Sequence, residues 1–305
     1  MPTFLLKRLL QSLAVFLGVS LVIFLMLRTA GDPVQILLGE EGTQHDVARL
    51  REALGLDRSL PVQYVLFLRN ALRGDLGVSY HHGVPAMELV LERVPATLEL
   101  AGAAMLIAVV LAIPLGVIAA NGRGGFWDRF FLSGSLVGIS APPFWVGIVC
   151  ILVFGVVFRW LPTSGRGGWE HLILPAGSLA LYRLALFIRL VRSGMLDVLG
   201  QDYVRTARSK GLAEQAVVFK HALKNTLIPF ITIAGLQMGS LLAGAVVTER
   251  VFAWPGMGRL ILDSIQKLDY PVVMCWALVT AAIFILINLA VDVSYSFVDP
   301  RVRSG

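Results

Sequence analysis

Long apolar runs separated by short polar segments form the hydrophobic pattern of the chain. A membrane-crossing helix needs about 20 consecutive apolar residues, because the hydrocarbon core of a bilayer is about 30 Å thick. Six runs meet this requirement, near residues 9–27, 97–120, 130–157, 172–188, 227–247 and 272–295. The pattern therefore predicts an all-α fold, a polytopic membrane bundle of six transmembrane helices.

Two of these runs contain proline. Pro114 lies in the second run, and Pro142 and Pro143 lie together in the third. Proline removes a backbone hydrogen bond and bends a helix, which a membrane helix tolerates where neighbours satisfy the freed carbonyl. We therefore expect both runs to cross the membrane as kinked helices.

The segment between the first two runs, residues 31–95, is predicted to be an extracytoplasmic helical insertion. Thr43 and Asp46 have capping-box spacing at the start of one short helix, and Gly55 is placed to end it. A second helix is predicted from Pro61 to a stop near Gly74. Their apolar faces need cover, so we expect both helices to pack on the outer mouth of the bundle.

The composition supports a membrane protein. Of the 305 residues 56% are hydrophobic and only 15% are charged, whereas soluble domains carry about 25% charged residues. The formal net charge of +6 is compatible with nucleic acid, with anionic lipid or with orientation in a membrane. The position of the basic residues decides between these alternatives.

Lysine and arginine concentrate beside alternate ends of the runs. They lie at positions 7 and 8; at 123 and 129; at 189, 192, 205, 208, 210, 220 and 224; and at 301 and 303. With six spans these segments share one side, which the positive-inside rule assigns to the cytoplasm. Both termini are then cytoplasmic, and no nucleic-acid partner is expected.

The predicted domain organisation follows from these assignments. It comprises residues 1–30 with the first span, 31–95 as the insertion, 96–298 as a five-helix transmembrane core with a cytoplasmic segment at 191–226, and 299–305 as a cytoplasmic tail.

Catalytic motifs are missing from the sequence. It contains no GxxxxGK[ST] phosphate loop, no HExxH and no GxSxG. His81 and His82 are adjacent but have no further ligand at metal spacing, so no metal site is predicted. Cys150 and Cys275 lie in apolar runs, where we interpret them as small core residues. The chain is predicted not to be an enzyme.

Ionisable residues inside the runs point to function or to partners, because charge in a membrane is costly. Glu99, Glu249 and Arg250 lie near the predicted outer ends, where we expect them to snorkel to the interface. Arg183 lies deeper, about 9 Å of helix rise from Arg189. Two alternatives are open for Arg183: it faces a water-filled path, or it pairs with an acid of another span.

The stretch DYVRTARSKGL, residues 202–212, is a basic interruption between the fourth and fifth runs. Val204, Ala207 and Gly211 form one face of small side chains on a predicted helix, and Gly211 is placed to end it. Such a face is suited to entering a groove on another protein. The alternative is a basic patch that binds anionic lipid.

A second helix is predicted to follow this stretch directly. Its apolar stripe, Leu212, Ala216, Phe219 and Leu223, is expected to lie along the floor of the bundle.

These residues resemble the cytoplasmic loop of bacterial ABC-importer permeases, whose form is EAA, three residues, Gly, nine residues, then I-x-L-P. Gly211 is the glycine of that pattern. Arg205, Thr206, His221 and Lys224 depart from this general pattern. They match instead the motifs DYxRTARxKG and HxLxN, which are usual in the dipeptide, oligopeptide and nickel branch of the family. Nearly the whole chain is similar to this branch, through the segments GDP, LGLD, GDLGVS, RVPATLEL, LPTSG, ERVFAWPGMGRL, DYPVV and DPRVR.

The resemblance implies a permease subunit of a binding-protein-dependent importer in the bacterial inner membrane. Its partners would be two cytoplasmic ATP-binding subunits, a second and different permease subunit, an extracytoplasmic solute-binding protein and membrane lipid. ATP and Mg would be used by the ATP-binding subunits, and this chain would bind no cofactor. Di- and oligopeptides are the expected solutes; glutathione, nickel complexes or another small solute are the alternative. A secondary transporter or channel without an ATPase is less favoured, because no internal repeat is evident.

The resemblance also assigns residues to roles. ATPase coupling falls to Asp202, Tyr203, Val204, Arg205, Thr206, Ala207, Lys210, Gly211 and Leu212. Independently of the resemblance, Arg183 and Gln237 are predicted to lie on the substrate pathway, Arg183 because its charge lies inside a span, and Arg183 is expected to favour solutes with a carboxylate. Docking of the binding protein is assigned to Trp254, Pro255, Gly256 and Gly258, and a plain loop with an interfacial tryptophan is the alternative there.

Overall fold

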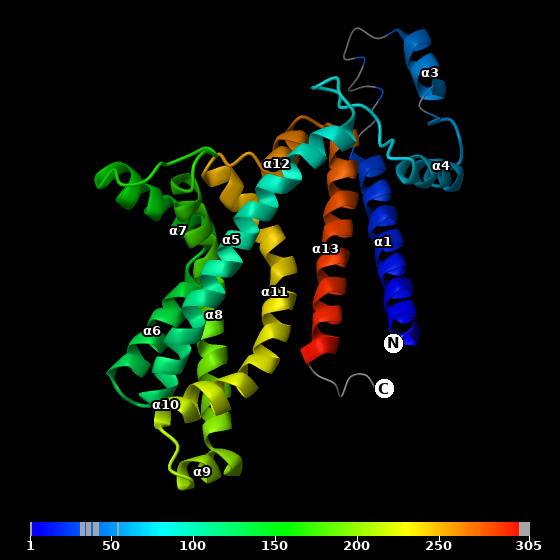
Figure 1. Cartoon of the computed structure of the whole chain (residues 1–305). Coiled ribbons are helices and arrows are strands. Elements are labelled where there is room, and N and C mark those ends of the chain that lie inside the picture. The colour runs from blue at the N-terminus through cyan, green and yellow to red at the C-terminus, as the bar shows by residue number, and fades with distance from the viewer. Residues whose placement is uncertain (1, 31–33, 35–37, 39–42, 54, 299–305) are drawn as a thin grey trace. The chain divides into compact units, whose positions relative to one another are not determined.

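The computed structural model describes residues 2–30, 34, 38, 43–53 and 55–298, and this part of the chain is helical almost throughout (Figure 1). Its α-helices are α1 (Pro2–Ala30), α3 (Gln44–Ala53), α4 (Leu60–Leu72), α5 (Ala86–Asn121), α6 (Phe126–Ser140), α7 (Pro143–Cys150), α8 (Glu170–Leu199), α9 (Asp202–Ser209), α10 (Glu214–Ala216), α11 (Lys224–Val251), α12 (Met257–Gln266) and α13 (Tyr270–Val298). Two π-helical segments, η2 (Ile151–Val157) and η3 (Val217–Leu223), continue α7 and α10. The β pairing in the described residues is a single bridge between Val78 and Pro85.

Four helical stretches are long and apolar enough to cross a membrane: Ala86–Asn121, Trp169–Leu199, Glu214–Val251 and Tyr270–Val291. The pair Phe126–Ser140 and Pro143–Val157 qualifies only when taken together, and α1 contains a shorter apolar stretch, Leu10–Met26. The prediction of an all-α, polytopic membrane protein is confirmed. The count of six spans stays a prediction.

The third apolar run is not the single kinked helix that we expected. α6 and the α7–η2 helix meet at an angle of 105°. Ala141 (ψ 124°) and Pro142 (ψ 133°) are both extended, because each precedes a proline, and proline disfavours the helical conformation of the residue before it. Two consecutive extended residues turn the chain sharply. Single prolines do not have this effect, since Pro175 and Pro229 lie inside continuous helices.

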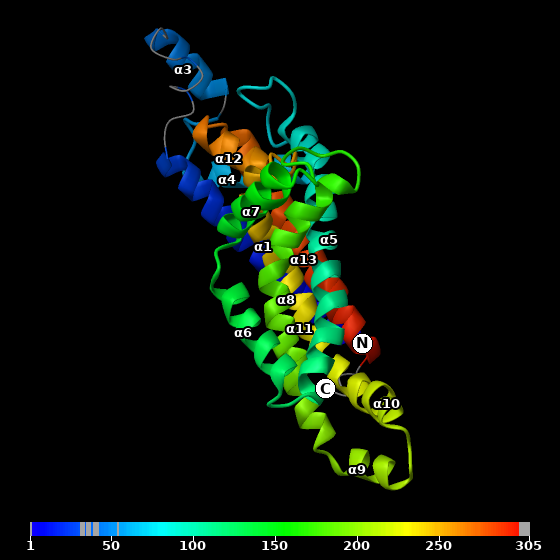
Figure 2. The same cartoon turned by 90° about the vertical axis from the view of Figure 1, so that its left-hand side faces the viewer.

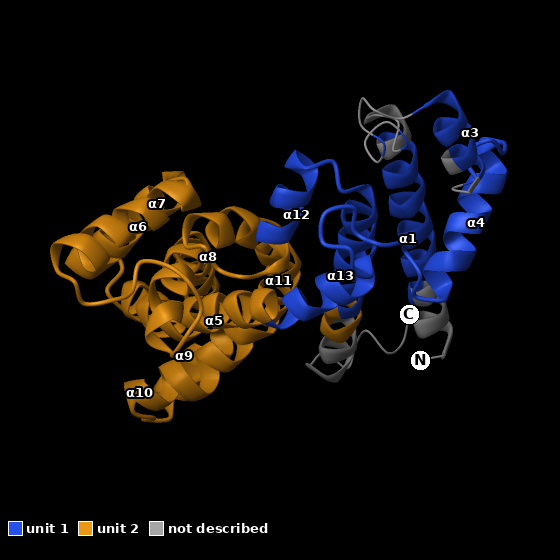
Figure 3. Cartoon of the chain, turned by 90° about the horizontal axis from the view of Figure 1, so that it is seen from above, with its two compact units in different colours: residues 1–95, 259–286 blue, residues 96–258, 287–305 orange. Residues whose placement is uncertain are grey.

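The described helices form two compact units, one of residues Met1–Pro95 with Arg259–Leu286 and one of residues Ala96–Gly258 with Ile287–Gly305 (Figure 3).

In the first unit the insertion helices begin and end as the sequence predicts. The hydroxyl of Thr43 accepts from the Asp46 backbone N–H at 3.3 Å, and the Asp46 carboxylate accepts from the Thr43 N–H at 3.3 Å, which completes the capping box. Gly55 has a φ of +64°, and its N–H donates to the Glu52 carbonyl. α4 begins at Leu60, with Pro61 in its first turn.

α4 packs against the later part of α1. The Tyr64 hydroxyl lies 2.8 Å from the Ser20 hydroxyl. The ring of Phe24 lies 5.4 Å from that of Tyr64 and 5.8 Å from that of Phe67, measured between centroids, and Phe24 is buried. Within the first unit, then, the first apolar helix packs on the side of α4 that carries Tyr64 and Phe67, whereas other apolar side chains of α4, such as Val65, stay exposed. The predicted place at the mouth of the bundle stays a prediction.

α8 is the central helix of the second unit and lies between α6 and α11 (Figure 2). A Cβ at Gly138 of α6 would lie 3.1 Å from the Ala185 side chain of α8, so the small residues let these two helices approach closely. On the side of α11, the Phe187 and Phe230 rings meet edge to face at 5.2 Å. At one end of this unit lie α9, α10 and the α5–α6 turn, and at the other end lies the turn from α11 into α12 (Figures 1 and 2).

Candidate functional site

The short helix α9 presents a different face from the one predicted to dock. Val204 is fully buried and Ala207 is 7% exposed, and they pack with Val217 of η3 beside Val198 and Leu199 at the end of α8. The small face therefore fixes α9 to its own chain. Our expectation that this face enters a groove on another protein is wrong for Val204 and Ala207, because their contacts are already made within the unit.

The opposite face of α9 and the turn after it are open to solvent. The exposed residues are Asp202, Tyr203, Arg205, Thr206, Arg208, Ser209, Lys210, Gly211 and Leu212. Arg205 lies 3.7 Å from Asp202, and Arg208 lies 2.6 Å from Glu214. The hydrogen bond to Glu214 raises the pKa of Arg208 above its ordinary value, so the side chain stays charged. The face available to a partner is thus polar and carries basic side chains.

Gly211 ends α9 as the sequence predicts. Its φ of +77° lies in the left-handed region, which glycine adopts without a steric penalty. The Gly211 N–H donates to the Arg208 carbonyl at 2.9 Å, and the Leu212 N–H donates to the Ala207 carbonyl at 3.4 Å. These two bonds are those of a Schellman motif, and they satisfy carbonyls that the helix end would otherwise leave free.

A side-chain hydrogen bond joins α9 to the start of α11. The Asn225 amide nitrogen donates to the Tyr203 hydroxyl at 2.7 Å and to the His221 carbonyl at 3.1 Å. Asn225 is the last residue of the HALKN motif, so the sequence marked it as part of a family segment. Its contact with Tyr203 becomes visible only in the folded chain. α9 is therefore held both by an apolar contact and by this bond.

The helix after α9 does not bury the predicted stripe of Leu212, Ala216, Phe219 and Leu223. Phe219 is 57% exposed and Leu212 is 42% exposed, whereas the buried side chains are those of Val217, Val218 and Ala222. The reason is that residues Val217–Leu223 are π-helical, with hydrogen bonds between residues five apart. Val217 and Ala222 therefore share a face, which a period of 3.6 residues does not predict.

Arg183 and Gln237, the two predicted pathway residues, are linked through Ser240. The Arg183 Nη2 donates to the Ser240 hydroxyl at 3.0 Å, and this hydroxyl lies 2.9 Å from both the backbone carbonyl oxygen and the Oε1 of Gln237. Arg183 is 7% exposed, and its guanidinium lies over the ring of Tyr182 at 5.2 Å. Pairing with an acid, one of the two alternatives for Arg183, is not seen among the described residues. No sequence pattern pointed to Ser240.

The WPGMG turn, residues 254–258, folds inward. Trp254 is 1% exposed, and its indole N–H donates to the Ala96 carbonyl at 2.8 Å. Gly256 and Gly258 are buried and Pro255 is partly exposed. An interfacial tryptophan, the alternative reading of this turn, is therefore wrong. A docking role for these four residues stays a prediction, and the burial leaves Pro255 as the member of the segment best able to touch a partner directly.

Glu249 explains why this turn contains glycines. It is fully buried and accepts a hydrogen bond from the Thr97 hydroxyl at 2.6 Å, and that hydroxyl accepts the Met257 N–H at 2.8 Å. A Cβ at Gly256 would lie 2.3 Å from the Glu249 carboxylate. The expectation that Glu249 snorkels to the membrane interface is wrong. Glu99 differs, because it is exposed and pairs with Arg166.

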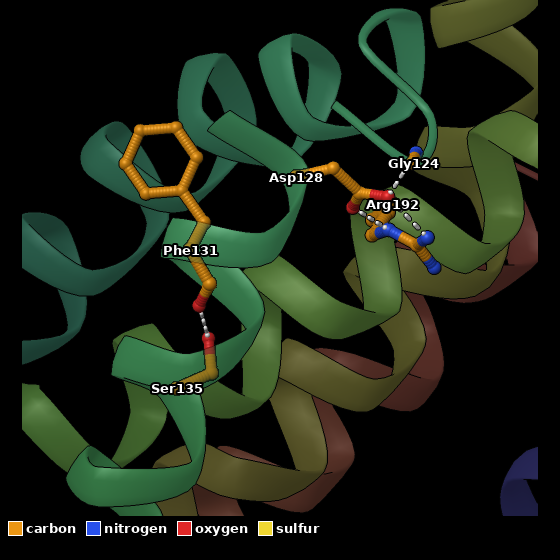
Figure 4. A network of polar contacts seen from close by, with 5 residues as sticks. All are labelled: Gly124, Asp128, Phe131, Ser135 and Arg192. Atoms are coloured by element: carbon orange, nitrogen blue, oxygen red, sulfur yellow. Dashed lines mark hydrogen bonds and ion pairs between the residues drawn. The ribbon is translucent and has the colours of Figure 1, made fainter. Parts of the chain in front are cut away.

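A buried ion pair at the α9 end of the unit was not predicted. Asp128 of α6, which is 3% exposed, accepts from the Arg192 guanidinium of α8 at both carboxylate oxygens, one of them at 2.8 Å from Nη2 (Figure 4). The same carboxylate accepts the Gly124 N–H at 2.8 Å, which anchors the α5–α6 turn. The available signal was an acid in the first turn of a helix after a glycine-rich segment.

Together these features define a multi-pass helical membrane protein with a short, exposed basic helix at one end of its core. Residues 112–304 match the family described as the binding-protein-dependent transport system inner membrane component, and residues 1–101 match its N-terminal membrane component. The chain belongs to this family.

Curated relatives cover the chain almost completely. The probable peptide ABC transporter permease protein y4tP of Sinorhizobium fredii is 39% identical over 312 residues, covering 99% of this chain and 100% of that protein. The dipeptide transport system permease protein DppB of Escherichia coli K12 is 40% identical over 336 residues, covering 99% of both chains. The glutathione transport system permease protein GsiC of Salmonella paratyphi A is 40% identical over 304 residues, again covering 99% of both. These relatives confirm the resemblance found in the sequence.

A solved structure has a related fold. The MetNI methionine ABC transporter in an inward-facing conformation aligns with a TM-score of 0.58 and 21% identity, covering 70% of this chain and 97% of that one. The core helices therefore follow an importer-permease fold.

Proposed function

We propose that this chain is a transmembrane permease subunit of an ATP-driven, binding-protein-dependent importer of di- and oligopeptides. Two cytoplasmic ATP-binding subunits, a second and different permease subunit and an extracytoplasmic binding protein complete the assembly. The chain lies in the bacterial cytoplasmic membrane with both termini in the cytoplasm. ATP and Mg are used by the ATP-binding subunits, and this chain binds no cofactor.

The exposed basic face of α9 is the observation that carries this proposal. A helix that transmits force must keep its shape and be joined firmly to the spans that move. Val204 and Ala207 fix α9 to α8 and η3, and the Tyr203–Asn225 bond ties it to the start of α11. A push on the exposed side of α9 is then passed to two membrane helices at once. The chain itself supplies no nucleotide chemistry, since its sequence has no phosphate loop.

Charge complementarity gives a direct test of docking. We expect Arg205→Glu together with Lys210→Glu to weaken binding of the ATP-binding subunits at least tenfold, because charge reversal replaces attraction by repulsion at a contact. The matched control is Arg189→Glu, which changes an exposed arginine outside α9. Equal loss of binding in both proteins, or no loss in either, would count against the docking surface.

Peptides are favoured over other solutes because the relatives include peptide and dipeptide permeases at 39–40% identity. Glutathione, itself a small peptide, is the second candidate, supported by the glutathione permeases at 40% identity. Nickel complexes or another small solute are the remaining alternative.

Reconstitution of the complete importer tests the solute and the energy source together. We expect uptake of labelled alanyl-alanine to require ATP and the binding protein, and excess glutathione to compete weakly. Transport at full rate by this chain without ATP-binding subunits would instead indicate a secondary transporter or channel. Stronger uptake of glutathione than of the dipeptide would favour the second candidate.

A further inference from the structure

Arg183 places a charge near the middle of α8, opposite the middle of α11. At 1.5 Å per residue, Arg183 lies about 20 Å from the first residue of α8, and Gln237 lies about 20 Å from either end of α11. Charged side chains at such depth are costly and mark pathways or partners. The position alone therefore calls for something that compensates the charge.

Hydrogen-bond donors exceed acceptors around this arginine. The guanidinium has five N–H donors, of which the structure pairs one with Ser240, and the buried Nε has no partner. The Gln237 amide nitrogen also has no partner in the part of the chain that the structure describes. Since no acid lies beside Arg183 among those residues, the site has a positive charge and unused donors. The ring of Tyr182 compensates this charge only in part.

The α11 side of the site is exposed to solvent. Ser240 is exposed and Gln237 is partly exposed, so the chain of hydrogen bonds leads from the buried guanidinium outward. One turn further along α11 lies Gly244, which has no side chain. A Cβ at this position would lie 3.7 Å from the Arg183 Nη1, so the glycine leaves the guanidinium uncovered on that side.

We propose that Arg183, Ser240 and Gln237 form a binding station for the free carboxylate of the transported solute. The carboxylate accepts from the Gln237 side-chain amide and from the Ser240 hydroxyl, whose single proton turns from the Gln237 oxygens to the ligand. The guanidinium behind them supplies the charge. This proposal rests on the proposed function, because it requires the open face of α11 to line the pathway.

A first experiment tests the charge without requiring transport. In the complete importer, with Cys150 and Cys275 replaced by alanine, Ser240→Cys is labelled with an anionic and with a cationic methanethiosulfonate reagent, and mass spectrometry of this chain gives the two rates. The ratio of the rates cancels any effect on thiol ionisation. We expect Arg183→Gln to lower the anionic-to-cationic ratio about tenfold, because a unit charge within about 6 Å attracts one reagent and repels the other.

The matched control is Ile231→Cys, which is exposed on α11 but lies nine residues from Ser240, on the opposite face of the helix and about 14 Å away along its axis. Its ratio should stay within twofold when Arg183 is replaced. An unchanged ratio at Ser240→Cys, or an equal change at both cysteines, would overturn the proposal.

A second experiment tests the ligand class by comparing uptake of alanyl-alanine with uptake of its C-terminal amide. The binding protein is the same for both permeases, so its own preference cancels in the comparison. We expect Arg183→Gln to reduce the preference for the free carboxylate at least fivefold, and Arg183→Lys to restore part of it. Equal loss of both solutes, or loss of the second permease subunit from the complex, would show a structural or intersubunit role and overturn the proposal. If the unmodified importer took up neither peptide, the peptide function would fail while the labelling result still stood.

Discussion

At Gly211 a substitution strains the backbone without creating a side-chain clash. Its φ is +77°, and an added Cβ would have no atom within 4 Å. A substitution therefore acts through the backbone alone. Alanine in the left-handed region costs about 1 kcal/mol, a β-branched residue costs about 2–3 kcal/mol, and asparagine tolerates this region better than either.

These costs fall on the Schellman turn, whose two hydrogen bonds hold the end of α9. A cost of about 2 kcal/mol lowers the ratio of formed to unformed turn about 30-fold. Because the exit of α9 is part of the proposed ATPase contact, we expect Gly211→Val to reduce solute import at least fivefold while ATP hydrolysis and membrane insertion persist. The measurement is the number of ATP molecules hydrolysed per solute imported in proteoliposomes, with the amount of inserted chain determined separately.

The order of the variants makes the test specific. We expect the asparagine variant to import most, the alanine variant less and the valine variant least. Side-chain size alone would instead place alanine before asparagine. The control is Gly200→Ala at the other end of α9, where φ is −80° and the nearest atom to a new Cβ is 3.6 Å away. Import by Gly211→Val within twofold of the unmodified chain would refute the reasoning, as would an order that follows side-chain size.

Three further changes test the stability of the second unit through the melting temperature in detergent. Asp128→Asn is expected to lower the free energy of unfolding by about 3 kcal/mol by breaking a buried ion pair, whereas Asp202→Asn, at an exposed pair, should leave it unchanged; equal shifts would mean that the Asp128–Arg192 pair contributes no more than an exposed pair. Gly258→Ala is expected to lower the free energy of unfolding by about 1–3 kcal/mol, because its Cβ would lie 2.4 Å from a Val246 backbone atom. Gly134→Ala is the control: it has open space in a helix and should stabilise the protein slightly. An unchanged melting temperature for Gly258→Ala would show that the turn adjusts to the methyl group without cost. Trp254→Phe keeps an aromatic ring but removes the pyrrole part of the indole together with its N–H donor to a buried carbonyl, so we expect the free energy of unfolding to fall by about 2–4 kcal/mol; a loss below about 0.5 kcal/mol would mean that neither the hydrogen bond nor the packing of the indole contributes much.

Local features of the fold were predictable because neighbouring residues determine them. Thr43 and Asp46 cap α3 through groups three residues apart, and Gly55 and Gly211 end their helices with positive φ angles. Apart from the third, the apolar runs likewise correspond to long helices. In each case the decisive atoms lie within one or two turns of chain, so a linear pattern contains the information.

Periodicity failed where the backbone left the regular α-helix. Two adjacent prolines turned the third run by 105°, because each forces its predecessor into an extended conformation. The π-helical turns of η3 placed Val217 and Ala222 on one face and left Phe219 exposed. A period of 3.6 residues assumes one hydrogen-bond pattern throughout, and neither segment obeys it.

By itself the sequence determined the class of protein, its family and the residues around which function should be sought. Apolar length, motif wording and the position of Gly211 are properties of the linear chain. Only the tertiary structure decided which sides of those residues are available. It buried Val204 and Ala207 of α9 and Trp254 of the WPGMG turn, and it joined Arg183 to Gln237 through a serine on another helix. Burial and hydrogen bonding depend on segments distant in sequence, and the linear pattern does not contain those contacts.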